Sequence, residues 1–237
     1  MTSIQTKDLN AGYGKFQVLY DINFEAKTKD ITVIVGPNGS GKSTLLKSIM
    51  GLTSVYSGFV KYGEENITNL PAHERSLKGI AYLPQTESVF STLSVRENLV
   101  MSGHALSKEE FENRVAYVAE LYPIVKECYD QKLKLLSGGE RQMVAMAMSL
   151  LREPQVILFD EPTASLAPKV AFEVLSKIVE LKDSLGLTLI VVEQAVKHAL
   201  EIGTKAYLLA NGRAIFEGDA QELLAHKEFS RMYLGLT

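Results

Sequence analysis

Apolar residues near the start of the chain recur with the period of two that marks β-strands. Residues 3–9 alternate crudely and residues 18–26 alternate clearly. We expect one face of the second segment to carry Val18, Tyr20, Ile22, Phe24 and Ala26. Residues 31–35 are almost continuously apolar, which predicts a strand buried on both faces. A glycine-rich segment and a helical pattern at 44–50 follow, so this part predicts a phosphate-binding strand, loop and helix.

The middle of the chain has helical patterns instead. Ser-x-x-Glu capping boxes at 94–97 and 107–110 predict helices that start near residues 95 and 108. An apolar stripe on the second helix consists of Phe111, Val115, Val118, Ala119 and Tyr122. Pro123 should end that helix, and a third helix should begin near Ser137.

Strand and helix signals alternate again after residue 150. Apolar runs at 156–159 and 187–192 predict buried strands, and a helix from Pro168 should end before Gly186. Residues 206–216 predict a hairpin whose turn is Asn211-Gly212, the dipeptide that a two-residue type I′ turn favours. From residue 219 we expect short helices that end in Tyr-Leu-Gly at 233–235.

These patterns predict one α/β domain over residues 1–237, with a mainly parallel sheet covered by helices. Residues 1–86 and 151–237 should form the α/β core. Residues 87–150 should form a helical subdomain inserted into it.

Charge and composition narrow the functional classes. The formal net charge is −3, so the chain lacks the excess of Lys and Arg that a nucleic-acid-binding domain needs. The single cysteine, Cys128, favours a reducing compartment and a structural role. Four scattered histidines lack metal-ligand spacing. No stretch approaches the roughly 18 apolar residues of a membrane span, so we expect a cytoplasmic protein that reaches a membrane only through a partner.

Residues 36–43 read GPNGSGKS, which matches the phosphate-binding P-loop at every fixed position. Glycines let backbone N–H groups surround phosphate oxygens, and the next helix points its positive end at the same anion. Lys42 would contact the β- and γ-phosphates of ATP, and the Ser43 hydroxyl would bind Mg²⁺. The predicted nucleotide contacts are Gly36, Pro37, Asn38, Gly39, Ser40, Gly41, Lys42, Ser43 and Thr44.

Two adjacent carboxylates, Asp160 and Glu161, follow the apolar run at 156–159. Ligands of parallel α/β sheets gather at the carboxyl ends of strands, so these acids should lie near the phosphates. Alternate strand residues face opposite ways, which favours separate roles. We expect Asp160 to bind Mg²⁺, largely through water, and Glu161 to orient or deprotonate the attacking water.

The sequence Leu-Ser-Gly-Gly-Glu at 136–140 opens a predicted helix. A serine hydroxyl and two glycines at a helix N-terminus form a second anion-binding element. One chain with one P-loop has no further phosphate for it to bind. We therefore expect Ser137, Gly138 and Gly139 to close on a nucleotide held by another chain.

With these motifs in this order, nearly the whole chain resembles the ABC ATPase family. The resemblance implies a RecA-like P-loop core, an N-terminal antiparallel β part, a helical subdomain and a head-to-tail dimer around two ATP molecules. It implies ATP hydrolysis that drives transport by membrane permease subunits. It also assigns Tyr13 to adenine stacking, and Gln85 to the glutamine that links the γ-phosphate and metal region to the permease.

A closer resemblance is to the ATPase subunits of branched-chain amino acid importers, which work with an external substrate-binding protein. It rests on AGYGKFQVL, SVRENLVMSG, LSGGERQM, VVEQ, the terminal YLG and the LAP at 166–168. Gln194 stands where most of the family has a switch histidine, and Ala167 where many have an aspartate. Glutamine can hydrogen-bond phosphate but does not titrate near neutral pH. We expect residues 87–93 to contact the permease.

Alternatives stay open at this stage. AYLPQ at 81–85 resembles lipopolysaccharide-export ATPases, so an exporter of that type is a second hypothesis. A soluble ABC protein acting on nucleic acid usually has tandem cassettes or coiled-coil insertions, which this chain lacks. A regulatory module that does not hydrolyse ATP is disfavoured by Lys42, Asp160 and Glu161.

Overall fold

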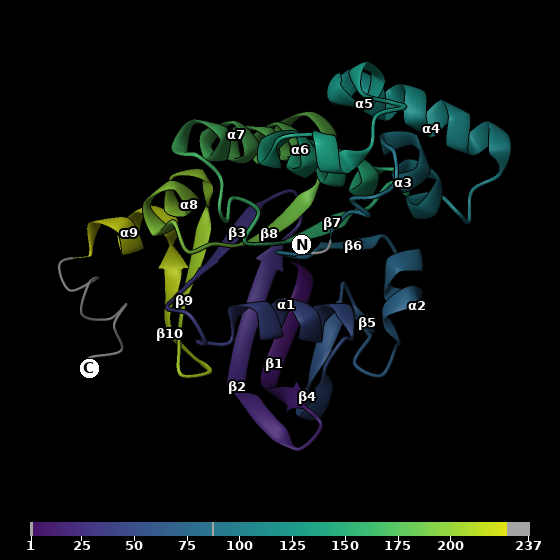
Figure 1. Ribbon diagram of the computed structural model, residues 1–237. Helices are drawn as coiled ribbons and strands as arrows, with labels where there is room; N and C mark the ends of the chain where they lie inside the picture. The colour runs from purple at the N-terminus through teal and green to yellow at the C-terminus, as the bar shows by residue number, and fades with distance from the viewer. Residues whose placement is uncertain (1, 87, 227–237) are drawn as a thin grey trace.

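The computed structural model describes residues 2–86 and 88–226 and contains two β-sheets in that part of the chain (Figure 1). The four-stranded sheet has the order β2-β1-β4-β5, and the six-stranded sheet the order β10-β9-β3-β8-β7-β6. The strands are β1 (Thr2–Tyr13), β2 (Phe16–Lys27), β3 (Ile31–Val35), β4 (Ser54–Tyr62), β5 (Glu65–Asn66), β6 (Ile80–Leu83), β7 (Val156–Asp160), β8 (Thr188–Val192), β9 (Lys205–Ala210) and β10 (Arg213–Asp219).

Five consecutive strands of the larger sheet, from β9 to the edge strand β6, are parallel, which confirms the mainly parallel sheet that was predicted. Every residue of β3, β7 and β8 is buried, because both faces of the sheet are covered. Ile31, Val33 and Val35 pack in a core with α6 (Gly138–Leu150) and α7 (Pro168–Leu185), whereas Ile34 packs in a second core with α1 (Lys42–Met50) and the antiparallel strands. Figure 1 shows α6 and α7 on one side of the sheet and α1 on the other.

In the antiparallel sheet, the prediction that Tyr20 lies on the apolar face of residues 18–26 is wrong. Tyr20 does not share a face with Ile22 and Phe24: its side chain is exposed, and Leu19 is buried instead. The pairing of β1 with β2 shifts register here, and Asp21 has a φ of 51°. A bulge of this kind inserts a residue and exchanges the two faces of the strand, which alternation alone does not reveal.

The predicted helical starts are confirmed. Complete capping boxes open α3 (Val95–Ser102) and α4 (Lys108–Leu121), and α4 ends directly before Tyr122 and Pro123. The stripe from Phe111 to Tyr122 faces the core. The remaining short helices are α2 (Ala72–Leu77), α5 (Ile124–Glu127), the 3₁₀ turn η1 (Leu133–Leu135), α8 (Val196–Ile202) and α9 (Ala220–Ala225).

The C-terminal hairpin also follows its prediction. Asn211 and Gly212 both have positive φ, 48° and 74°, as a type I′ turn requires. The predicted helix α9 is present, but the Tyr-Leu-Gly segment at 233–235 and residue Glu87 lie outside the described residues. The division into 1–86, 87–150 and 151–237 stays a prediction.

Candidate functional site

The glycine loop joins β3 to α1 and is shaped by close backbone approach. Gly36 and Gly41 have φ of 153° and 103°, which L side chains rarely adopt. A Cβ at Gly36 would overlap the carbonyl oxygen of Leu209, and one at Gly41 would lie 2.7 Å from the Leu19 side chain. The loop is therefore enclosed from behind by β9 and β2. Its tip, Asn38 and Gly39, remains exposed.

The turn of the β9–β10 hairpin supports the same loop. Gly212 N–H donates to the Ser40 carbonyl oxygen at 3.0 Å, and Tyr20 N–H donates to the Gly212 carbonyl oxygen at 2.8 Å. A Cβ at Gly212 would overlap the Val18 carbonyl oxygen. Arg213 strengthens the junction with an ion pair of 3.0 Å to Asp21. The loop therefore depends on a turn about 170 residues further along the chain.

Lys42, the predicted phosphate ligand, is only 4% exposed. Its Nζ donates to the carbonyl oxygens of Gly36 at 2.9 Å and Pro37 at 3.1 Å, and lies 3.9 Å from Glu161 Oε1. Burial lowers the pKa of Lys42, while the nearby carboxylates of Glu161, Asp160 and Glu193 raise it. The ammonium group thus lies inside the loop, next to the acids that follow β7.

Ser43 and Asp160 form the predicted oxygen pair. Ser43 Oγ donates to Asp160 Oδ1 at 2.7 Å, although the residues are 117 positions apart. Tyr82 on β6 donates its hydroxyl to Asp160 Oδ2 at 2.9 Å. Burial, and then the Asp160 charge, raise the pKa of Tyr82, so the hydroxyl stays protonated as a donor. Tyr82 was not identified from sequence; a polar aromatic within an apolar strand was the available signal.

Glu161 begins the loop after β7 and leaves the extended conformation, with a φ of 50°. Its carboxylate is 7% exposed. Gln85 and Gln194 donate their side-chain amides to the same oxygen, Oε2, at 2.7 and 2.6 Å. Glu161 therefore forms one hydrogen-bonded group with Gln85 and Gln194, the two glutamines that the family resemblance singled out, and the two adjacent acids contact different partners.

Tyr13 is separate from this group. It ends β1, opposite Phe16, and is 44% exposed. Tyr56 donates its hydroxyl to the carbonyl oxygens of Gly14 at 3.0 Å and Phe16 at 3.2 Å, and so braces the turn beside Tyr13. An exposed ring on a braced turn is available for stacking on a planar ligand.

The Ser-Gly-Gly tip of α6 is also separate. Ser137 Oγ accepts from Glu140 N–H at 3.3 Å, and Glu140 Oε2 accepts from Ser137 N–H at 2.6 Å, which completes a capping box. The pKa of Glu140 is lowered by these bonds. Ser137 and Gly138 are exposed. Over residues 2–86 and 88–226, no hydrogen bond or ion pair joins 137–139 to the glycine loop.

Comparison with known proteins identifies the family. Residues 19–164 match the ABC transporter family. The chain is 48% identical to the probable branched-chain amino acid transport ATP-binding protein LivF of Archaeoglobus fulgidus, over 98% of this chain and 99% of LivF. It is 33% identical to the lipopolysaccharide export system ATP-binding protein LptB of Escherichia coli K12, over 99% of this chain and 98% of LptB.

Solved structures give the same fold. The ADP conformation of MJ1267, an ATP-binding cassette of an ABC transporter, matches with a TM-score of 0.89 and 28% identity over 99% of each chain. The dimeric post-hydrolysis state of the cassette MJ0796, bound to ADP and Pi, matches with a TM-score of 0.78 and 26% identity, over 92% of this chain and 98% of that one.

Proposed function

Since this chain belongs to the ABC transporter family and is one of its ATPases, we propose that its described site binds MgATP and hydrolyses it to drive a membrane transporter. The observation that carries this proposal is the meeting of Lys42, Ser43, Asp160 and Glu161 at the carboxyl ends of β3 and β7. In parallel α/β sheets this edge is where ligands bind.

ATP binding would use the loop backbone and Lys42. The γ-phosphate would take Lys42 away from the Gly36 and Pro37 carbonyl oxygens, which it can exchange because phosphate is the stronger, charged acceptor. The exposed Tyr13 ring would stack on adenine. The nucleotide-contacting set we propose is Tyr13, Gly36, Pro37, Asn38, Gly39, Ser40, Gly41, Lys42, Ser43 and Thr44 from one chain.

The oxygen donors near the loop fit Mg²⁺, a hard cation that prefers oxygen ligands. Ser43 Oγ and Asp160 Oδ1 already adjoin at 2.7 Å, and Gln85 offers an amide oxygen. The described residues contain no group of three or more His, Cys, Asp or Glu able to hold a metal, so phosphate and water oxygens would complete the shell. Bound Mg²⁺ would neutralise charge on the β- and γ-phosphates.

Hydrolysis would depend on Glu161. Its carboxylate would accept a proton from water as the water oxygen attacks the γ-phosphorus and the bond to the β–γ bridging oxygen breaks, giving ADP and phosphate. Gln85 and Gln194 hold Glu161 Oε2 and would orient this base and the phosphate. Gln194 would replace the usual histidine as a hydrogen-bonding group without titrating.

We propose a head-to-tail dimer in which Ser137, Gly138 and Gly139 of one chain cover the nucleotide of its partner. Ser137 and Gly138 are exposed, and the Ser137 side chain and N–H are bonded only to Glu140 within the same turn, so the tip could turn its helix N-terminus toward an anion. The similar cassette MJ0796 has been solved as a dimer bound to ADP and Pi, which supports a dimer of this chain. The segment 87–150 would act as the helical subdomain that carries this tip.

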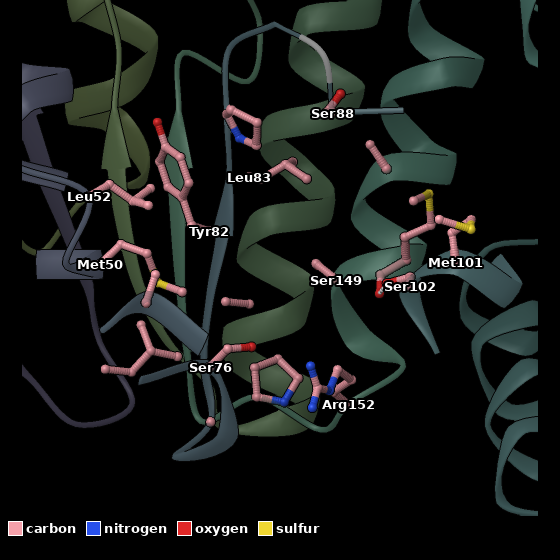
Figure 2. A pocket seen from close by; sticks show the side chains of 18 of the residues that line it. Met50, Leu52, Ser76, Tyr82, Leu83, Ser88, Met101, Ser102, Ser149 and Arg152 are labelled. Carbon is pink, nitrogen blue, oxygen red and sulfur yellow. Dashed lines mark hydrogen bonds between the residues drawn. The ribbon is translucent and has the colours of Figure 1, made fainter. Parts of the chain in front are cut away.

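A cleft of about 410 Å³ is our candidate for permease docking (Figure 2). It lies between β6 and α3, and its lining includes Tyr82, Ser88 and Met101. Tyr82 also hydrogen-bonds Asp160 and so belongs to both the cleft and the proposed nucleotide site, and Ser88 follows Gln85 by three positions. Exposed Leu52, Phe90 and Met101 supply apolar contact area near it.

We propose import of branched-chain amino acids, because LivF is far more similar to this chain than LptB is. Lipopolysaccharide-type export is the second candidate, favoured by the AYLPQ sequence and the LptB match. No helix in residues 2–86 and 88–226 is long and apolar enough to cross a bilayer. The chain would bind the cytoplasmic face through permease subunits, with an external substrate-binding protein for import.

The test is purification of the transporter from membranes with this chain as bait, followed by reconstitution in vesicles. We expect two permease subunits to co-purify and labelled leucine uptake to require MgATP. Purification with lipopolysaccharide-binding subunits would favour export, and an ATPase that binds no membrane subunit would contradict the proposal.

A further inference from the structure

A buried carboxylate next to the site has so far no role in the reaction. Glu193 directly follows β8 and is only 2% exposed. Its Oε1 accepts from both the N–H of Thr163 at 2.9 Å and the hydroxyl of Thr163 at 2.7 Å. Its Oε2 accepts from Gln194 N–H at 3.2 Å. A buried carboxylate with three donors is a built contact rather than a solvated surface charge.

These bonds join the two loops that hold the proposed base. Thr163 lies two residues after Glu161, and Gln194, next to Glu193, donates to Glu161 Oε2. A backbone hydrogen bond joins the same two loops, because Glu161 N–H donates to the Val192 carbonyl oxygen at 2.9 Å. Glu161 is thus held through its amide, through the turn that follows it and through the Gln194 side chain.

We infer that Glu193 is a positioning residue: by clamping Thr163 to the loop of Gln194, it keeps the Glu161 carboxylate and the Gln194 amide aligned for attack by water. The inference rests on the proposed role of Glu161. Glu193 itself contacts neither nucleotide nor water in this scheme. It acts on the base as outer residues act on metal ligands, by fixing their orientation.

The acceptor chemistry explains why a carboxylate stands here. All three partners are donors, and a carboxylate is an acceptor on both oxygens. Glutamine has the same shape, but its NH₂ group would face either the Thr163 pair or the Gln194 N–H, donor against donor. Burial raises the pKa of Glu193, and the Thr163 and Gln194 bonds oppose that shift by stabilising the carboxylate.

The test compares Glu193→Gln with Thr163→Val and Thr163→Ser in the full chain. We expect Glu193→Gln to lower kcat about 10- to 100-fold, the range for outer residues that orient a site. ATP affinity, measured by calorimetry without turnover, should stay within about threefold, because Lys42 and the glycine loop are untouched. Thr163→Val should also lower kcat. Thr163→Ser keeps the hydroxyl and should therefore keep kcat close to that of the wild type.

Double variants separate positioning from general stability. On a Glu161→Gln background, Glu193→Gln should cause no further loss of turnover, because the group that it aligns is already absent. Unchanged kcat in both Glu193→Gln and Thr163→Val would overturn the inference, as would loss of ATP affinity in proportion to kcat. If Glu193→Gln does not fold, the kcat values of Thr163→Val and of its control Thr163→Ser test the inference without it. Normal hydrolysis by Glu161→Gln would refute the proposed base instead.

Discussion

The glycine loop and the tip of α6 have similar predicted chemistry but opposite surroundings. The Leu19 side chain of β2, the backbone of β9 and the 211–212 turn enclose the loop, and Lys42 within it is 4% exposed. At the tip of α6, Ser137 and Gly138 are exposed, and the hydrogen bonds of Ser137 stay within its first helical turn. The first of the two proposed phosphate-binding segments is thus enclosed by its own chain, whereas the second is exposed at Ser137 and Gly138.

This difference suggests that hydrolysis is controlled at the α6 tip rather than at the glycine loop. A loop that is already shaped loses little further conformational entropy when it binds a triphosphate. In the proposed dimer the tip would contribute only when a second chain presents a nucleotide, so hydrolysis would be conditional on assembly. The binding energy of closure would then be available to shift a permease between two states.

Removing the proposed base gives the largest expected effect and leaves both the glycine loop and the α6 tip intact. Glu161→Gln should lower phosphate release by about 10²- to 10⁴-fold, the contribution of a positioned general base. ATP affinity should be unchanged, and ATP-loaded dimers should accumulate because opening follows hydrolysis. Light scattering with and without ATP measures this. A variant that stays monomeric at saturating ATP would contradict the dimer, and unchanged phosphate release would contradict the base.

Blocking the tip should separate the two regions. Ser137→Arg places a long cation at the exposed face of α6, so we expect dimer closure and turnover to fall by about 10²-fold, comparable with loss of one preorganised anion-binding donor. Monomeric ATP affinity should stay within about threefold, since 137–139 makes no bond to the loop of its own chain. Calorimetry and phosphate release check both values. Weaker monomeric binding would show that the tip acts within one chain.

Lys42→Ala, unlike Ser137→Arg, should weaken ATP binding by the monomer. Loss of a charge-assisted contact of about 1.5 to 3 kcal/mol weakens ATP binding by roughly 10- to 100-fold. The variant should still fold, because removing Lys42 also removes a cation that burial disfavours, although Glu161 loses a neighbour at 3.9 Å. Thermal unfolding without nucleotide serves as the control. Undiminished affinity would refute the proposed role of the loop.

The motifs of the glycine loop and the α6 tip were predictable from the sequence, but the residues that support them were not. Apolar runs, capping boxes and the Asn-Gly turn are local signals, and the strands and helices they predicted are present. The bulge at Asp21, the Tyr82–Asp160 bond and the Glu193–Thr163 bonds depend on contacts between distant segments. No local pattern encodes which strand lies beside which. The site was therefore predictable as a set of motifs, but its supporting residues were not.

The smallest expected effect tests the support behind the glycine loop. Gly212→Ala should lower the free energy of unfolding by about 2 to 4 kcal/mol, from positive φ and overlap with the Val18 carbonyl oxygen. The overlap would displace the turn and so lengthen the backbone bond from residue 212 N–H to the Ser40 carbonyl oxygen, which should weaken ATP affinity by about three- to tenfold, roughly 0.6 to 1.4 kcal/mol.

Gly63 provides the matched control, since its φ is also positive, at 57°, but an added Cβ would meet nothing within 4 Å. Gly63→Ala should therefore cost about 1 kcal/mol of stability and leave ATP affinity unchanged. Denaturant titration and calorimetry on both variants give the comparison. Equal ATP affinities in the two would show that the 211–212 turn stabilises the fold without shaping the loop, and that the loop's own backbone suffices to hold phosphate.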